Sequence, residues 1–300
     1  MIESILREYV GCDVRTKIVD TVGGGCISRA FRVETTIGRW FVKLNDADFA
    51  DNFAAEADGL AALAAKDVDG LIVPDVIAHG VHLDDRTSKS SAFLVLPWID
   101  ARPASDSFEH RFGRTLANFH RANRSRRFGW SRDNYLGASK QINTATGKSG
   151  GWIEFVAECR FEPQLRWAAE RGLADDDLVR DVTQVVRRLG NLMDGSGDRF
   201  TLLHGDLWSG NIIDAGGSIA MIDPAVWRGV AEADLAMLRL FGGVGSTFWK
   251  SYQEIYPLDS RWSVRTDVFV LYHLLNHLNL FGRAYLDRCR RAAKDLIAAA

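Results

Sequence analysis

The segment HGDLWSGNII at residues 204–213 carries the strongest chemical signal in the chain. Asp206 and Asn211 are five residues apart, so one loop can offer a carboxylate to a substrate hydroxyl and an amide oxygen to a metal ion. Asp223 follows the strand-like run at residues 219–222, and a glycine turn before that run would bring Asp223 back beside Asn211. Two acids and one amide in this arrangement predict phosphoryl transfer.

A lysine and a glutamate upstream support the same chemistry. A strand is predicted at residues 39–44, with Lys43 as its one inward-pointing lysine, and a helix is predicted at about residues 51–66, with Glu56 near its start. Kinases hold the α- and β-phosphates of ATP with a strand lysine that pairs with a helix glutamate. The alternative is that Lys43 is solvated, as strand lysines usually are.

A glycine run separates two predicted strands near the N-terminus. Gly23, Gly24, Gly25 and Ser28 would let a loop cover a nucleotide, since glycines allow the backbone to approach phosphates closely; a plain hairpin turn is the alternative. Cys26 lies in this run, where nearby amides could lower a thiol pKa, so we consider it a candidate redox group that could bridge two protomers. The other three cysteines have no metal-ligand or disulfide spacing and are expected to be buried apolar groups.

These motifs resemble those of one family. HGDLWSGN followed by IDPA is similar to the fructosamine-3-kinase (ketosamine-3-kinase) family, a branch of the protein-kinase-like fold that includes aminoglycoside and choline phosphotransferases. The HGD-x(4)-N pattern alone would indicate only this wider superfamily, whereas Trp208 and the run YHLLNHLNLFG at residues 272–282 indicate the ketosamine kinases within it. The resemblance extends from about residue 20 to the C-terminus. It implies a bilobal α+β fold, with a small β-rich nucleotide-binding lobe (residues 1–96) and a larger, mostly helical catalytic and substrate lobe (residues 97–300).

The resemblance also implies a role for each residue of the central motif. Asp206 would accept the proton of the attacking hydroxyl, and Lys43, positioned by Glu56, would hold the phosphates of ATP. Asn211 and Asp223 would hold Mg²⁺. A further acid, Asp234, would accept hydrogen bonds from the backbone of the catalytic loop, as in related phosphotransferases, and His204 is expected to fix that loop.

The apolar strand at residues 92–96 leads into a segment that resembles the kinase hinge. By analogy, the carbonyl of Pro97 would accept a hydrogen bond from adenine and the N–H of Ile99 would donate one. The family commonly has an acidic residue at the position of Pro97. Because proline keeps its C=O, this departure leaves adenine binding possible while it stiffens the hinge.

Four residues are candidates for the substrate pocket. Trp208 could stack its flat face on a sugar or amine substituent, or it could only pack the loop. Asn134 lies in a segment similar to the family's FGW-x-x-DNY-x-G, although Asp-Asn is also ordinary turn chemistry. His273 and His277 share a helix face and match the family motif, with burial in the core as the alternative.

The implied acceptor is the 3-hydroxyl of a ketosamine, meaning a fructosamine or ribulosamine adduct, and the implied role is deglycation repair. Two other functions stay open: a phosphotransferase for another hydroxylated amine of the aminoglycoside or choline type, and a nucleotide-binding pseudokinase. The second is disfavoured because the lysine, the base and the metal ligands are all present. Residues 227–230 read WRGV where the family often has a tyrosine and an acid, which leaves substrate preference open.

Composition limits the remaining possibilities. The chain has 300 residues, is 47% apolar and has a net charge of −2, so it can bury a large core and offers no basic field to a nucleic acid. We expect no nucleic-acid partner. The N-terminus lacks a signal-peptide pattern and the longest apolar stretch is interrupted by polar residues, so we expect no membrane span and a cytoplasmic monomer or homodimer.

Overall fold

The computed structural model describes two compact units, Met1–Ser105 with Gly210–Pro224, and Asp106–Ser209 with Ala225–Ala300. The boundary between residues 96 and 97 that we expected from the sequence stays a prediction. The described residues are 1–11, 17–21 (backbone only), 27–84, 87–103, 105, 107–144, 150–197 and 199–300.

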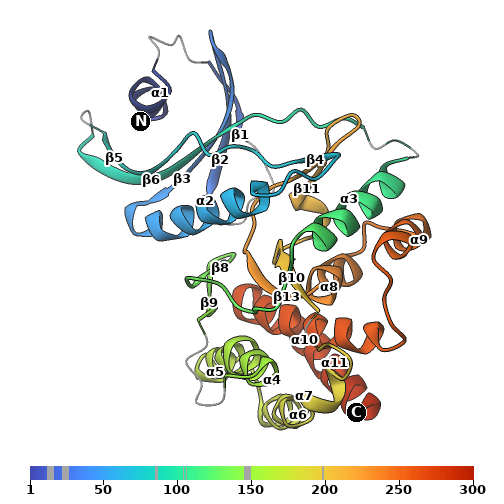
Figure 1. Ribbon diagram of the computed structural model, residues 1–300. Coiled ribbons are helices and arrows are strands. Elements are labelled where there is room, and N and C mark those ends of the chain that lie inside the picture. The colour runs from blue at the N-terminus through green and yellow to red at the C-terminus, as the bar shows by residue number, and fades with distance from the viewer. Residues whose placement is uncertain are drawn as a thin grey trace. The chain divides into compact units, whose positions relative to one another are not determined.

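The first unit is built on a five-stranded antiparallel sheet with the order β1-β2-β3-β6-β5 (Figure 1). Alternation along the strands gives the sheet two apolar faces. Helix α1 packs Ile5 and Leu6 on one face, and helix α2 packs Phe53 and Leu60 on the other. The elements are α1 (Ile2–Val10), β1 (Lys17–Thr21), β2 (Arg29–Thr35), β3 (Gly38–Asp46), η1 (Ala47–Phe49), α2 (Ala50–Ala64), β5 (Ala78–Asp84) and β6 (Lys89–Pro97).

A second, three-stranded sheet in this unit joins segments that are far apart in the sequence. Its order is β11-β12-β4, with β11 (Ile212–Asp214) and β12 (Ile219–Met221) forming a hairpin, and β12 running parallel to β4 (Leu71–Ile72). Gly216 closes the hairpin turn with a φ of +77°, a backbone conformation that glycine adopts without strain. The turn predicted before Asp223 is therefore present.

The second unit is mostly helical. One apolar core is shared by most of its helices, and the side chains of Val182, Leu189, Leu203, Phe269 and Leu275 in this core are all fully buried. The helices are α3 (Phe108–Ala122), α4 (Trp152–Val156), α5 (Glu162–Glu170), α6 (Asp176–Arg187), α7 (Leu189–Leu192), α8 (Glu232–Phe241), α9 (Ser246–Ile255), α10 (Trp262–Phe281) and α11 (Leu286–Ala299), with short turns η2 (Ala157–Phe161), η3 (Ser209–Asn211) and η4 (Arg283–Tyr285).

Two small sheets complete the second unit. The first has the order β13-β10-β7, with β10 (Phe200–Leu203) in the centre between β7 (Arg124–Ser125) and β13 (Trp227–Val230). The second is a hairpin of β8 (Asn134–Leu136) and β9 (Ser139–Gln141). Strand β10 delivers the chain directly to His204. The described residues contain no helix that is both long and apolar enough to cross a membrane.

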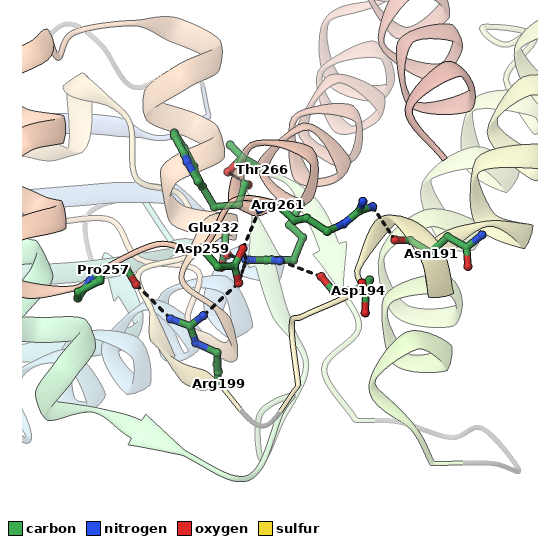
Figure 2. A network of polar contacts seen from close by, with 10 residues as sticks. Asn191, Asp194, Arg199, Glu232, Pro257, Asp259, Arg261 and Thr266 are labelled. Carbon is green, nitrogen blue, oxygen red and sulfur yellow. Dashed lines mark hydrogen bonds and ion pairs between the residues drawn. The ribbon is translucent and has the colours of Figure 1, made fainter.

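Polar contacts of the buried Arg265 tie the start of α8 to the start of α10, and Figure 2 labels its partners Asp194, Glu232 and Asp259. The Arg265 side chain is 1% exposed, and its NH2 lies 2.6 Å from Oε1 of Glu232 and 2.8 Å from Oδ1 of Asp259, while its NH1 donates to the Asp194 carbonyl at 2.8 Å. Arg199 binds the other carboxylate oxygen of Asp259 at 3.1 Å. A buried charge is tolerated when it is paired and hydrogen-bonded, so this network fixes the first turn of α8.

Candidate active site

The described residues hold candidate catalytic groups in both units, and each group is built within its own unit. In the first unit, alternation along β3 points Val42 and Leu44 toward α1, so Lys43 points to the face that α2 covers. On α2, Glu56 lies three residues after Phe53 and four before Leu60, and therefore shares the helix face that packs on the sheet.

Lys43 lies between two carboxylates. Its Nζ atom donates to Oε1 and Oε2 of Glu56 at 2.9 and 3.0 Å, and it lies 2.7 Å from Oδ1 of Asp223. Burial by itself lowers the pKa of the Lys43 ammonium, but the charges of Asp223 and Glu56 raise it by more, so the net pKa lies above its usual value. The structure thus brings together three of the residues that the sequence singles out.

Because Glu56 and Asp223 are two carboxylates around the single ammonium of Lys43, this cluster has an excess of negative charge. Burial raises the pKa of Glu56 to about 7, the Asp223 carboxylate adds to the rise, and Lys43 opposes it. A bound cation beside Asp223 would relieve the repulsion between the two acids.

The raised pKa of Glu56 predicts a pH dependence of stability. Because the folded-state pKa of about 7 exceeds the ordinary value of 4.5, the stability contributed by protonated Glu56 is fully present below about pH 4.5 and is lost as the pH rises through about 7. A Glu56→Gln variant keeps the neutral form at every pH. We expect the melting temperature of the variant, relative to that of the wild type, to rise between about pH 5 and pH 8 when both are measured by differential scanning fluorimetry. A difference that is constant over this range would contradict the raised pKa of Glu56.

Asn211 and Asp223 lie together on the β11–β12 hairpin. The N–H of Ile222, next to Asp223, donates to the carbonyl of Asn211 at 3.1 Å. Asp223 is 35% exposed and has a φ of +56°, in the left-handed region that aspartate tolerates better than most residues. An amide and a carboxylate oxygen suit Mg²⁺, which commonly takes one or two carboxylates and completes its shell with phosphate oxygens and water. The described residues contain no cluster of three His, Cys, Asp or Glu groups that could hold a metal by themselves.

One backbone carbonyl at the end of β6 is free to face away from the sheet, as the predicted hinge requires. Pro97 pairs with Trp40, and the N–H of Trp98 donates to the carbonyl of Arg39 at 2.9 Å. Because the C=O and N–H of one peptide unit point in opposite directions, the C=O of Pro97 points away from β3. Adenine recognition by this carbonyl and by the N–H of Ile99 stays a prediction.

The glycine run lies mostly outside the described residues. Gly23, Gly24, Gly25 and Cys26 lie outside the described residues, so their predicted roles are untested. Ser28 is described, and its hydroxyl accepts a hydrogen bond from the Asn45 amide at 3.1 Å. Of the remaining cysteines, Cys159 and Cys289 are free and buried, and burial raises both thiol pKa values, that of Cys289 to about 12.

In the second unit, Asp234 holds the loop that carries Asp206. Its carboxylate accepts from the N–H groups of His204 and Gly205, each at 2.8 Å, and Nε2 of His120 lies 3.2 Å from the same carboxylate. Burial alone would raise the pKa of Asp234, but His120 and the loop lower it by more, so the group stays ionised. Asp206 follows directly, half-buried, with its N–H donating to Nδ1 of His204 at 3.3 Å.

The close approach of two backbone segments explains the glycine in this loop. Gly205 has a φ of +84°, and a Cβ atom there would lie 2.0 Å from the carbonyl oxygen of Ala225. Only glycine fits this position without a backbone shift. The loop that carries Asp206 is therefore fixed by Asp234 on one side and by Ala225 on the other.

The substrate candidates occupy different surroundings. Trp208 and His277 both contact Phe241, with ring-centroid distances of 6.5 and 4.8 Å, so the structure brings these two together in one aromatic cluster. His273 is 2% exposed, and burial and the charge of His277 lower its pKa to about 3, so it is neutral. Asn134 is 3% exposed, and its amide donates to the Val226 carbonyl at 2.7 Å.

The comparisons with known proteins agree with this geometry. A family model described as fructosamine kinase matches residues 1–299. The chain belongs to the fructosamine kinase family. A relative in Arabidopsis thaliana named protein-ribulosamine 3-kinase, chloroplastic, is 33% identical over 99% of this chain and 89% of its own, and a "Probable ketoamine kinase" of Vibrio cholerae is 36% identical over 97% and 96%.

Solved structures give the same result for the fold. A crystal structure from Thermobifida fusca named "putative fructosamine-3-kinase" is 33% identical, with a TM-score of 0.83 over 100% of this chain and 99% of that one. The aminoglycoside phosphotransferase APH(4)-Ia, at 15% identity and a TM-score of 0.65 over 99% and 98%, shares the fold alone. The predicted family, the protein-kinase-like fold and the assignment as a kinase are confirmed.

Several polar residues of this fructosamine kinase family member were missed by the sequence reasoning. His120 on α3 links Asp234 to Tyr252, whose hydroxyl lies 2.8 Å from Nδ1 of His120. Arg160 and Tyr272 are buried beside the β8–β9 hairpin. A charged residue at an apolar position of an amphipathic helix is a signal that could have identified Arg160.

Proposed function

We propose that this protein transfers the γ-phosphoryl group of ATP to the 3-hydroxyl of a ketosamine. The observation that carries the proposal is the contact of the Lys43 ammonium with both Glu56 and Asp223, in a chain that matches the fructosamine kinase model from end to end. A cation held in this way suits the α- and β-phosphates of a nucleotide.

Each residue then has a chemical role. The carboxylate of Asp206 accepts the proton of the attacking hydroxyl; a new bond forms between that oxygen and the γ-phosphorus, and the bond to the β,γ-bridging oxygen breaks, so that ADP leaves with the electron pair. Asn211 and Asp223 would hold Mg²⁺, which neutralises charge on the phosphates. Positioning and charge stabilisation supply most of the acceleration.

The aromatic cluster supports a substrate with an apolar or cationic substituent. Trp208 is half-buried and edge-on to Phe241, and burial lowers the pKa of His277 so that it is neutral beside them. Aromatic faces stack on sugar rings and attract cations, and a ketosamine has both a sugar and an amine. Phosphorylation at the 3-hydroxyl would make the adduct prone to elimination and release of the amine, a repair reaction.

An acceptor screen tests the proposal. ATP consumption by the purified protein with Mg²⁺ is compared for ribuloselysine, fructoselysine, an aminoglycoside and choline. We expect turnover with at least one ketosamine and none with choline. Turnover with the aminoglycoside or choline alone would retain the kinase and overturn the acceptor, and no turnover with any acceptor would favour a nucleotide-binding protein without catalysis.

A further inference from the structure

One buried cation in the second unit has no carboxylate partner among the described residues. Arg160 is 0% exposed and lies in the π-helical turn η2. Its NH2 donates to Oδ1 of Asn143 at 2.8 Å, and its NH1 donates to the carbonyls of Ile142 and Cys159. Burial lowers the pKa of Arg160, but arginine stays protonated in proteins, so a full charge is buried here.

Aromatic faces take the place of a counter-ion. The Arg160 guanidinium carbon lies 4.1 Å from the ring centroid of Trp227, 4.8 Å from that of Phe155 and 5.8 Å from that of Tyr272. Cation–π attraction is strongest for tryptophan and grows when the pair is desolvated. A buried charge without a carboxylate in ion-pair contact is costly, and the nearby charge of Asp133 offsets only part of the effect of burial. Because π-helical turns are also frequent at functional sites, the position of Arg160 calls for a functional reason.

The guanidinium organises the β8–β9 hairpin and the residues after it. Asn143, which Arg160 binds through its Oδ1, donates from its Nδ2 to Oδ1 of Asn134 at 2.9 Å. Gln141 donates to the same Asn134 oxygen at 2.8 Å. Three buried amides therefore form one connected network with the cation at its end, and these hydrogen bonds restrain the segments that they join.

This network ends on the segment that contacts the catalytic loop. Gln141 donates to the carbonyl of Ala225 at 3.1 Å, and Asn134 donates to the carbonyl of Val226 at 2.7 Å. The N–H of Ala225 in turn donates to the carbonyl of His204 at 2.9 Å. Arg160 thus reaches the backbone beside Asp206 through a continuous series of hydrogen bonds within one unit.

Tyr272 provides a second connection. Its hydroxyl donates to Oε1 of Gln141 at 2.9 Å. Burial raises the pKa of this phenol to about 12; the charge of Arg160 opposes the rise, and that of Asp206 adds to it. The pKa of the Tyr272 phenol is therefore affected by the charges of both Arg160 and the predicted base, Asp206.

The departure of residues 227–230 from the family pattern has a physical role in this arrangement. Trp227 supplies the ring nearest to the guanidinium, and the ring packs so closely over Gly229 that a Cβ atom there would lie 2.3 Å from it. The large ring at position 227 and the absent side chain at position 229 depend on each other. Together they hold Arg160 in place.

We propose that Arg160, held against Trp227, is a positioning residue that fixes residues 134–143 and 225–227 against the catalytic loop and so sets the acceptor side of the site. The consequence for acceptor turnover depends on the function proposed above. Residues 134–143 begin within the segment that resembles the family's FGW-x-x-DNY-x-G, residues 128–137, but the side chain of Asn134 acts within the network. Its contribution to substrate binding is to place its neighbours.

Hydrogen exchange of the full-length protein tests this proposal without reference to activity. In Arg160→Lys, which keeps the charge but loses the planar fork and the stack, we expect amides in residues 134–143 and 225–227 to exchange about tenfold faster, with α11 unchanged. The matched control is Arg265→Lys, an equally buried arginine whose partners are carboxylates. Its faster exchange should fall in residues 194–199 and 256–259 instead. Uniform exchange changes, or none in the 134–143 segment, would overturn the proposal.

Steady-state kinetics separate positioning from simple stabilisation. We expect kcat/KM for the ketosamine to fall about 10- to 100-fold in Arg160→Lys, while KM for ATP changes less than about twofold. Faster exchange with unchanged acceptor kinetics would reduce Arg160 to a stabilising role and overturn the proposal.

A second variant, Trp227→Phe, keeps a smaller ring and should show the same changes in exchange and kinetics at lower amplitude. It replaces Arg160→Lys if that variant does not fold. A wild type without ketosamine turnover would overturn the proposed function, and exchange would still test whether Arg160 fixes the loop.

Discussion

Replacing Asp206 by alanine should reduce kcat for a ketosamine by about 10³-fold and leave ATP affinity within about twofold of the wild type. The expected loss follows from the removal of the carboxylate that accepts the hydroxyl proton. Nucleotide affinity should persist because Lys43, Glu56 and Asp223 belong to the other unit and keep their mutual contacts. Coupled ADP release measures the first quantity, and titration with a fluorescent ATP analogue measures the second.

Two further variants make the Asp206 result specific. Asp206→Asn keeps the shape of the side chain and should be almost as inactive, because an amide does not accept the proton. Asp287→Ala removes a carboxylate that is 83% exposed on α11 and should behave as the wild type. If Asp206→Ala retained more than about a tenth of the wild-type kcat, Asp206 would not be the base.

Replacing Lys43 by methionine should remove both stability and nucleotide binding. The change leaves the carboxylates of Glu56 and Asp223 facing each other with no cation between them, and the loss of one partner from a buried ion pair costs about 3 kcal/mol. We expect this loss in the free energy of unfolding from urea denaturation. We also expect the affinity for ATP to fall at least about tenfold.

A double variant and a surface lysine serve as controls for Lys43→Met. Lys43→Met/Glu56→Gln removes one of the two unpaired charges, so it should recover part of the lost stability without recovering ATP affinity. Lys89→Met removes a lysine of the neighbouring strand β6 that is 63% exposed, at 3.8 Å from Asp46, and should cost less than about 1 kcal/mol. Equal losses of stability for Lys43→Met and Lys89→Met would contradict the buried cluster.

The sequence predicts the fold well where a local pattern coincides with the tertiary contacts. Helix α3, Phe108–Ala122, is one such case, because its apolar residues recur at helical spacing and face the core. The β11–β12 hairpin was predicted from its glycine turn. The pairing of Lys43 with Glu56 was also predicted, since the alternation of the strand and the periodicity of the helix place both side chains on the faces where the strand and the helix pack together.

The missed features depend on contacts between residues that are distant in sequence. Between α4 and α5 a π-helical turn directs Arg160 into the core, and no local propensity predicts such a turn. The three-residue strands β8 and β9 have too few residues to show alternation. The burial of His273 and the aromatic surroundings of His277 depend on α8, which is about 35 residues away in sequence, so shared helix spacing could not separate their roles.

The small sheet of the first unit has a consequence for the order of events during protein synthesis. Strand β4 at Leu71–Ile72 pairs with β12 at Ile219–Met221, and Gly210–Pro224 belongs to the first unit although the intervening chain belongs to the second. At a translation rate of about 5 to 20 residues per second, the ribosome delivers residue 224 roughly 6 to 24 s after residue 105. Over that interval the nascent first unit lacks both the strand that completes its small sheet and the carboxylate of Asp223, and Lys43 can pair only with Glu56.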